Sequence, residues 1–146
     1  MPDPILVDSN KVLTASPDDA SVLAERLANG GLLVVGLCAD WCGTCKEFRL
    51  AFDRIAAAMP SATFVWLDIE DDSALAGDID IENFPSIAVF RNGEAVHYGV
   101  TDPLQGVVAR LLGALFENDR AATGIPPEVA ALPDLLARHA ARASVP

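Results

Sequence analysis

The chain lacks any long uncharged apolar run, and it carries little positive charge. No stretch of 18 or more residues is free of charged side chains, so a membrane-spanning helix is not expected. Ten basic residues stand against twenty-one acidic ones, which gives a net charge of -11. Such a chain repels phosphate backbones, and no cluster of Lys and Arg offsets the repulsion. Neither a nucleic acid nor a membrane is therefore expected as a partner.

Cysteine is scarce as well, with three residues in a chain of 146. The first residues, Met1-Pro2-Asp3-Pro4, do not show the basic and apolar segments of a secretory signal, so a cytoplasmic localisation is expected. In a reducing compartment three cysteines do not make a structural disulfide framework, and the odd number argues against complete pairing. A reactive or metal-binding role for the cysteines is favoured.

What the sequence does contain is a regular alternation of strand and helix patterns. Apolar runs at 32–37, 62–69 and 86–90 predict strands, and helical spacing of apolar residues predicts helices at 17–29, 45–59 and 104–115. An acidic loop at 70–73 leads into a short helix. Asn92-Gly93 predicts a tight hairpin between the third strand and a fourth. The resulting order is β-α-β-α-β-β-α over residues 20–117.

This order predicts an α/β fold with a central mixed sheet, in which parallel strands are joined by helical crossovers and an antiparallel hairpin ends the sheet. Helices are expected on both faces. Residues 1–117 are expected to form this domain, and residues 118–146 a C-terminal helical extension of the same single-domain unit. The helix at 104–115 is expected to bury one face, made of Leu104, Val107, Val108, Leu111, Leu112 and Leu115.

The three cysteines lie close together, at positions 38, 42 and 45. Cys42 stands at a predicted helix start, where free backbone N–H groups and the helix dipole favour the thiolate. Cys45 follows one turn later, close enough to attack a mixed disulfide formed at Cys42. Cys38 ends an apolar strand, and we interpret it as a buried packing residue.

A metal site is the alternative chemistry for these thiols. Structural zinc usually takes four ligands, and beyond the CxxC pair only Cys38, His97 and His139 remain. Both histidines are predicted to be ordinary surface residues. The cysteine spacing also matches the iron–sulfur motif of radical S-adenosylmethionine enzymes, but that family needs a much larger barrel domain. No metal and no cofactor is therefore expected.

The motif Trp41-Cys42-Gly43-Thr44-Cys45-Lys46 resembles the active-site motif of the thioredoxin family. Residues 83–86, Asn-Phe-Pro-Ser, and 90–94, Phe-Arg-Asn-Gly-Glu, are similar to the family's cis-proline loop and terminal hairpin. Gly99 matches the family glycine near the substrate groove. The resemblance covers about residues 20–117 and implies a thioredoxin-like fold.

The resemblance also implies roles for particular residues. Cys42 is the expected nucleophile and Cys45 the resolving thiol, and the two are expected to form the redox-active disulfide. The peptide bond before Pro85 is expected to be cis. Substrate contacts are expected from Trp41, Phe84, Pro85 and Gly99.

Three positions depart from the family pattern. Thr44 replaces a proline, which removes a constraint on φ. Gly36 stands where typical thioredoxins have a buried aspartate that assists proton transfer from the resolving thiol, and Trp66 stands where its lysine partner is expected. Asp40 and Asp68 remain as candidate proton acceptors, although both are interpreted as solvated surface acids.

These patterns predict a thioredoxin-like protein-disulfide reductase, a thiol–disulfide oxidoreductase of cell redox homeostasis. Protein disulfides are its expected substrates, and an external reductant such as a thioredoxin reductase or a small thiol is expected to restore the dithiol. The alternative is a thioredoxin-like adaptor or chaperone that binds a partner protein and keeps the CxxC motif as a redox switch.

Overall fold

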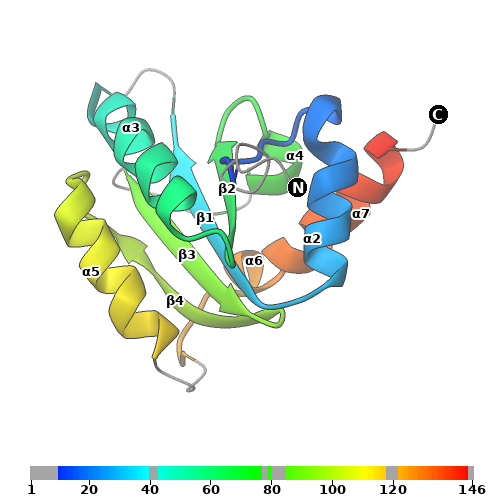
Figure 1. The fold of residues 1–146 in the computed structure, drawn as a ribbon. Coiled ribbons are helices and arrows are strands. Elements are labelled where there is room, and N and C mark those ends of the chain that lie inside the picture. The colour runs from blue at the N-terminus through cyan, green and yellow to red at the C-terminus, as the bar shows by residue number, and fades with distance from the viewer. Residues whose placement is uncertain (1–9, 40–42, 77–78, 80–84, 118–121, 145–146) are drawn as a thin grey trace, which may run out of the picture.

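A four-stranded sheet lies at the centre of the molecule, in the strand order β2-β1-β3-β4 (Figure 1). The computed structural model describes residues 10–39, 43–76, 79, 85–117 and 122–144. The strands are β1 (Leu32–Cys38), β2 (Thr63–Asp68), β3 (Ser86–Arg91) and β4 (Glu94–Val100). Their positions agree with the apolar runs of the sequence.

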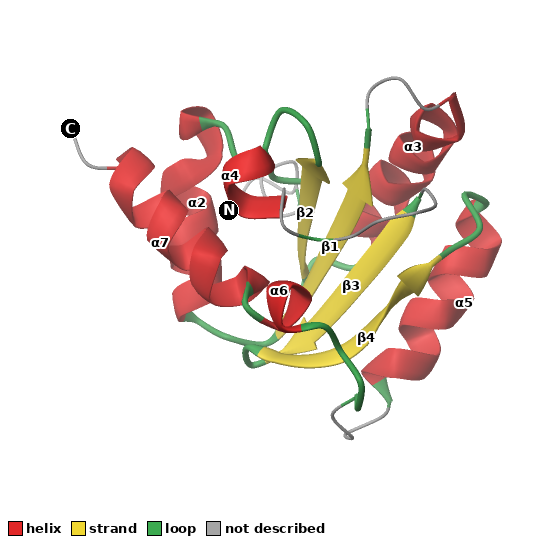
Figure 2. Cartoon of the chain, turned by 180° about the vertical axis from the view of Figure 1, so that it is seen from behind, coloured by secondary structure: helices red, strands yellow, loops and turns green. Residues whose placement is uncertain are grey.

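Helices cover both faces of the sheet, as predicted (Figure 2). One face is covered by α3 (Gly43–Ala58) and α5 (Gln105–Phe116). The other is covered by α2 (Ala20–Ala28), α4 (Ser73–Ala76), α6 (Pro127–Ala130) and α7 (Leu132–Ser144), with the short 3-10 helix η1 (Pro17–Asp19) leading into α2. The predicted α/β architecture is confirmed.

The direction of β3 differs from the expectation. β1 pairs in parallel with β2, but β3 pairs antiparallel with β1 and again antiparallel with β4. The prediction of parallel strands is therefore wrong at β3. A parallel strand requires a connection that returns along the whole sheet, usually as a helix, and the described part of the link between β2 and β3 holds only the four-residue α4. An apolar run predicts a strand but not its direction.

A serine caps the start of the first helical segment, and the hairpin turn forms as the sequence predicts. Ser16 accepts a hydrogen bond from the Asp18 backbone at 3.2 Å, ahead of η1 and α2. At the turn between β3 and β4, Asn92 has φ 50° and Gly93 has φ 84°. Positive φ at both central residues is what a two-residue hairpin turn requires, which explains the Asn-Gly pair.

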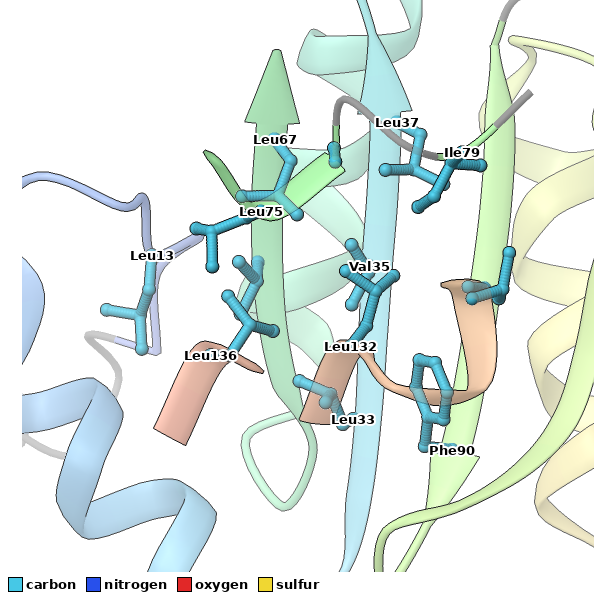
Figure 3. Packing of buried hydrophobic residues seen from close by; sticks show 14 of the residues in the cluster. Leu13, Leu33, Val35, Leu37, Leu67, Leu75, Ile79, Phe90, Leu132 and Leu136 are labelled. Atoms are coloured by element: carbon cyan, nitrogen blue, oxygen red, sulfur yellow. The ribbon is translucent and has the colours of Figure 1, made fainter. Parts of the chain in front are cut away.

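The side chains of β1 alternate between two apolar layers. Leu33, Val35 and Leu37 point toward α2 and α7, whereas Val34 and Cys38 belong to the layer under α3 and α5. Figure 3 shows Leu33 and Val35 among the buried side chains of the first layer. Because both faces of β1 are covered, this strand is the central element of both layers.

The C-terminal segment is part of the first layer. Val129 of α6 and Leu132, Leu136 and Ala140 of α7 are fully buried. Leu132 lies beside Leu33 and Val35 of β1 (Figure 3), Leu136 belongs to the same buried cluster, and the Nε2 atom of His139 lies 2.7 Å from the carbonyl oxygen of Ala15. His139 is thus half-buried in this contact, and its interpretation as an ordinary surface histidine is wrong. Helix α7 completes the cover beside α2.

Helix α5 buries less of its apolar face than its sequence suggests. Val108 and Leu112 are buried, but Leu104 is 52% exposed and Val107 is 41% exposed. Leu104 is the N-cap residue of α5, and Val107 stands in its first turn. The prediction that they are buried is wrong, because helical spacing shows which residues share a face but not whether other elements cover that face along its whole length.

A buried carboxylate fixes the segment before α2. One Asp19 oxygen accepts hydrogen bonds from the Thr14 backbone and hydroxyl, both at 2.8 Å, and the other lies 3.0 Å from the Lys11 ammonium. Burial alone raises the pKa of Asp19, but these hydrogen bonds and the Lys11 charge hold it below the ordinary value of 3.8. The segment so fixed includes Leu13, whose backbone bonds to Phe64 and Trp66 on β2.

We predict that Asp19→Asn lowers the free energy of unfolding by about 1 to 3 kcal/mol at pH 7, because the charge-assisted hydrogen bonds are lost. The folded-state pKa is depressed, so the contribution is present above the unfolded value of 3.8 and is lost as the pH falls through the folded value. Urea unfolding at several pH values should show the gap between the two proteins narrowing toward low pH. The exposed Asp18→Asn is the control, and an equal loss there would contradict the role of Asp19.

We predict that α7 is part of the single folding unit, so that Leu136→Ala costs about 2 to 5 kcal/mol. Urea unfolding followed by circular dichroism measures this loss, and the transition should remain a single step. Leu104→Ala removes the same atoms from an exposed position, and it should cost less than about 0.5 kcal/mol. A similarly small loss at Leu136, or a separate early transition for the helix, would show that the tail is only an appendage.

Candidate active site

The described part of the cysteine cluster lies where β1 ends and α3 begins. Cys38 is the last residue of β1, and Cys45 stands in the first turn of α3. The two are joined by a disulfide, with their Cα atoms 5.9 Å apart. Both belong to the apolar layer under α3 and α5, and Cys38 is 1% exposed and Cys45 3% exposed. The bond is therefore closed off from solvent.

Cys38 is the functional candidate that the sequence interpretation missed. Its burial in an apolar layer agrees with the predicted packing role, but its sulfur is bonded to Cys45, so it is not a mere packing residue. The alternation along β1 turns Cys38 toward α3, and the first turn of α3 turns Cys45 inward to meet it. The CxxC spacing indicates a contact between Cys42 and Cys45. The contact between Cys38 and Cys45 depends instead on how β1 and α3 pack.

Several predicted site residues lie outside the described part of the chain. Trp41, Cys42 and Phe84 are among them, and so is the Asp40 considered as a proton acceptor. The cis peptide bond expected before Pro85 also depends on Phe84. The disulfide between Cys42 and Cys45 stays a prediction, because in this structure the Cys45 sulfur is bonded to Cys38.

Pro85 lies beside the cysteine cluster. Ser86 is the pairing partner of Leu37, so Pro85 comes just before β3 at the end of the sheet where Cys38 ends β1. The Pro85 carbonyl oxygen accepts a hydrogen bond from the Thr101 backbone at 3.0 Å, and this joins the start of β3 to the end of β4. Gly99 lies on β4 opposite Ile87. The structure thus brings Pro85 and Gly99 to the end of the sheet that holds Cys38.

Aromatic side chains fill the region around Gly36. Gly36 pairs with Trp66 across β1 and β2. A Cβ atom added at Gly36 would lie 3.2 Å from Phe48 Cε2, 3.2 Å from Trp66 Cε3 and 3.3 Å from Phe52 Cζ. Few real side chains tolerate contacts this short, so glycine is the residue that lets the aromatic rings approach the backbone. The place of the family's buried acid is taken by an apolar cluster.

Asp68 is buried and takes part in a turn. It is the pairing partner of Cys38 on β2 and is 7% exposed. Its Oδ1 atom accepts hydrogen bonds from the Glu70 backbone at 2.8 Å and from the Asp71 backbone at 3.0 Å. The interpretation of Asp68 as a solvated surface acid is therefore wrong. Backbone groups of the acidic loop draw its carboxylate into the fold, which short-range sequence patterns do not reveal.

His97 is half-buried on β4. Its Nε2 atom has no hydrogen-bond partner, and burial lowers its pKa below the ordinary value of 6.5. The imidazole is therefore neutral at pH 7, and the expectation of an ordinary surface histidine is wrong for His97 too. Among the described residues, no three or more His, Cys, Asp or Glu side chains are grouped so that they could hold a metal ion.

The described residues also include no helix that is both long and apolar enough to pass through a bilayer.

The sequence matches the family model for thioredoxin over residues 15–110. It is 31% identical over 81 residues to thioredoxin of Ophiophagus hannah, a match that covers 54% of this chain and 77% of that protein. It is 30% identical over 78 residues to thioredoxin-1 of Schizosaccharomyces pombe, which covers 53% of this chain and 76% of the relative. The family match includes the cysteine cluster, Pro85 and the terminal hairpin.

The fold has solved counterparts. A crystal structure of a poplar wild-type thioredoxin h superposes with a TM-score of 0.62 at 21% identity, and it covers 75% of this chain and 99% of that one. Thioredoxin f of spinach chloroplast gives a TM-score of 0.58 at 19% identity, over 73% of this chain and 94% of that one. Helices α6 and α7 lie beyond the end of the family match. The chain therefore belongs to the thioredoxin family and is a thiol–disulfide oxidoreductase that acts on protein disulfides.

Proposed function

We propose that this oxidoreductase works as a reductase, with Cys42 as the attacking thiol and Cys45 as the resolving thiol. The placement of Cys45 carries the proposal. Cys45 stands in the first turn of α3 and is almost fully buried, so its sulfur lies close to the start of the helix and away from solvent. In the reduced protein, a thiol held in this way can attack a mixed disulfide at Cys42, one turn earlier in the chain, while external thiols are kept away from it.

The exchange runs in two steps. The Cys42 thiolate attacks one sulfur of a protein disulfide, forms a mixed disulfide and releases the first substrate thiol. Cys45 then attacks the Cys42 sulfur, which forms the Cys42–Cys45 bond and releases the second substrate thiol. Two electrons pass from the protein to the substrate. Cys42 directly precedes the 16-residue helix α3, whose free N–H groups and positive dipole end favour the attacking thiolate.

The surface next to Pro85 supports a protein substrate. Val100 is the pairing partner of Ser86 and is 60% exposed, and the exposed Leu104 and Val107 follow it. Apolar side chains at the mouth of a reactive site suit an extended, partly apolar peptide better than a small charged thiol. Trp41, Phe84, Pro85 and Gly99 would add the contacts that the family resemblance implies.

Proton transfer at Cys45 works without the family's acid–lysine pair in this proposal. The aromatic cluster around Gly36 leaves no space for a carboxylate at that position. Asp68 is close along the sheet, but its Oδ1 atom is committed to two backbone N–H groups. Water reaching the Cys42 side of the motif is then the acceptor, and the resolving step is the slow one.

The reducing equivalents come from outside the chain in this proposal. A thioredoxin reductase or a small thiol would reduce the Cys42–Cys45 bond, in the cytoplasm and as a part of cell redox homeostasis. One solved neighbour is a complex of ferredoxin:thioredoxin reductase with thioredoxin f2, and its TM-score to this chain is 0.58. In that structure a thioredoxin is in complex with a reductase, which supports a reductase as the class of partner for this chain.

An adaptor or chaperone is the second candidate. The observation that favours it is again the filled region at Gly36, because a binding protein has no need for proton transfer behind the motif. In that case the surface at Pro85 and Val100 would hold a partner without turnover. The two candidates differ in whether the thiols turn over.

We predict that Cys42→Ser abolishes the reduction of insulin disulfides, because the other two cysteines, Cys38 and Cys45, are buried and cannot make the first attack. The double variant Cys38→Ser/Cys45→Ser keeps Cys42 as its one thiol and should accumulate a covalent adduct with insulin that dithiothreitol releases. Turbidity measures the reductase activity, and non-reducing electrophoresis measures the adduct.

The triple variant with Ser at all three positions is the control for the adduct, and it should form none. Wild-type protein that binds a partner but fails to reduce insulin would support the adaptor instead.

We predict that Gly36→Asp does not restore the family's proton acceptor but destabilises the fold. Gly36→Ala should cost about 1 to 3 kcal/mol through overpacking against Phe48, Phe52 and Trp66. Gly36→Asp should cost several kcal/mol more, because it places an unpaired carboxylate in an apolar cluster. Urea unfolding measures both. Equal stability of the two variants, together with faster insulin reduction by the Asp variant, would show that the site has room for an acid.

A further inference from the structure

The chain has three cysteines, and the structure joins Cys38 to Cys45. A sulfur takes part in one disulfide at a time, so a protein with this bond has no partner for Cys42 within the chain. Cys45, the thiol assigned to resolution, is then withdrawn from the exchange. Neither sulfur of the bond is accessible, at 1% and 3% residue exposure. The structure therefore holds an oxidised state that differs from the one expected of CxxC.

We propose that Cys38 is a third redox-active cysteine and that the Cys38–Cys45 bond switches the protein from turnover to a state with a single active thiol. The inference rests on the proposed function of Cys42 and Cys45. It adds a second oxidised state and a regulation of that same site. In this state Cys42 can still attack a disulfide, but the mixed disulfide that it forms is not resolved by Cys45.

The switch is an internal thiol–disulfide exchange. The Cys38 thiolate attacks the Cys45 sulfur of the Cys42–Cys45 bond, the Cys38–Cys45 bond forms, and Cys42 leaves as a thiolate. The proton lost from Cys38 goes to water. No net oxidation occurs in this step, because the two electrons were already passed to the substrate disulfide in the preceding turnover. A thiolate stabilised at a helix start is a good leaving group, which favours this direction.

The surroundings of the bond favour the neutral disulfide. Cys38 and Cys45 lie in one apolar layer with Phe48, Phe52 and Ile87. An ionised thiol is costly in such surroundings, whereas a disulfide carries no charge and packs as an apolar group. Cys38 is also the register neighbour of Asp68, whose buried carboxylate adds to the cost of a second negative charge nearby.

The fold does not depend on this bond. The two cysteines are only seven positions apart, and cross-links that close short loops constrain the unfolded chain least. The strand and the helix that carry them are held by full layers of buried side chains on both faces of the sheet. The bond can therefore open and close in the folded protein, as a switch requires.

The test locates the free thiol in the oxidised full-length protein. Reduced wild type is oxidised with insulin disulfides, quenched in acid, and then unfolded in denaturant that contains N-ethylmaleimide, so that a buried free thiol is labelled as well. The remaining disulfide is then reduced and labelled with iodoacetamide. All three cysteines fall in the tryptic peptide 27–46, so fragmentation by mass spectrometry shows which one carries the first label.

The proposal expects the first label on Cys38 at early times and on Cys42 later, as the bond moves. A final ratio of Cys42 to Cys38 label of about ten would mean that the Cys38–Cys45 bond is favoured by about 1.4 kcal/mol. Label that stays on Cys38 at all times would overturn the proposal. So would a Cys38–Cys45 bond that persists in folded protein under dithiothreitol, because the bond would then be a fixed structural one.

An activity measurement separates this inference from the proposed function. Wild type held in the oxidised state should show a lag in insulin reduction when dithiothreitol is added, and Cys38→Ser and Cys38→Ala should show none. Two variants are used because a serine hydroxyl in the apolar layer can destabilise the fold. If all three proteins reduce insulin without a lag, the switch is wrong and the proposed reductase stands. If none reduces insulin after full reduction, the proposed function itself is wrong.

Discussion

The site depends on the burial of β1 on both faces. Side chains alternate along the strand, so the two apolar layers fix the direction in which each residue points. A shift of one residue would exchange the layers and turn Cys38 away from α3. The same alternation places Gly36 under the aromatic rings of α3 and β2. The packing of β1 therefore decides that Cys38 can reach Cys45. It also decides that position 36 has no room for a proton-accepting side chain.

The layer under α3 also sets the chemistry that is available to the thiols. Its aromatic residues pack tightly: the ring centroids of Phe48 and Phe52 are 5.3 Å apart, and those of Phe48 and Trp66 are 5.6 Å apart. Charged species are disfavoured in such a layer unless they are paired. A buried acid with its lysine partner, as the family pattern has it, would need a polar space that these rings occupy. The chain has apolar packing where its relatives' pattern places proton transfer.

Local sequence patterns predicted much of the fold, because the features concerned are local. The Asn92-Gly93 turn, the start of the first helix at Ser16 and the apolar strands each depend on neighbours within a few residues. The direction of β3, the docking of α7 and the bond at Cys38 depend on contacts between distant segments. For example, Leu132 is buried beside Leu33 and Val35 of β1, about a hundred positions earlier in the chain. The exposure of Leu104 likewise depends on which distant segments cover the start of α5.

The third cysteine links redox chemistry to the core. Here one of the three sulfurs ends a central strand, so each exchange that involves Cys38 joins α3 covalently to β1. Cys38 is 1% exposed and Cys45 is 3% exposed, so the proposed switch forms their bond by exchange within the chain and not by attack of an external thiol. In the proposed switch, Cys38 would thus control whether Cys45, the proposed resolving thiol, is free.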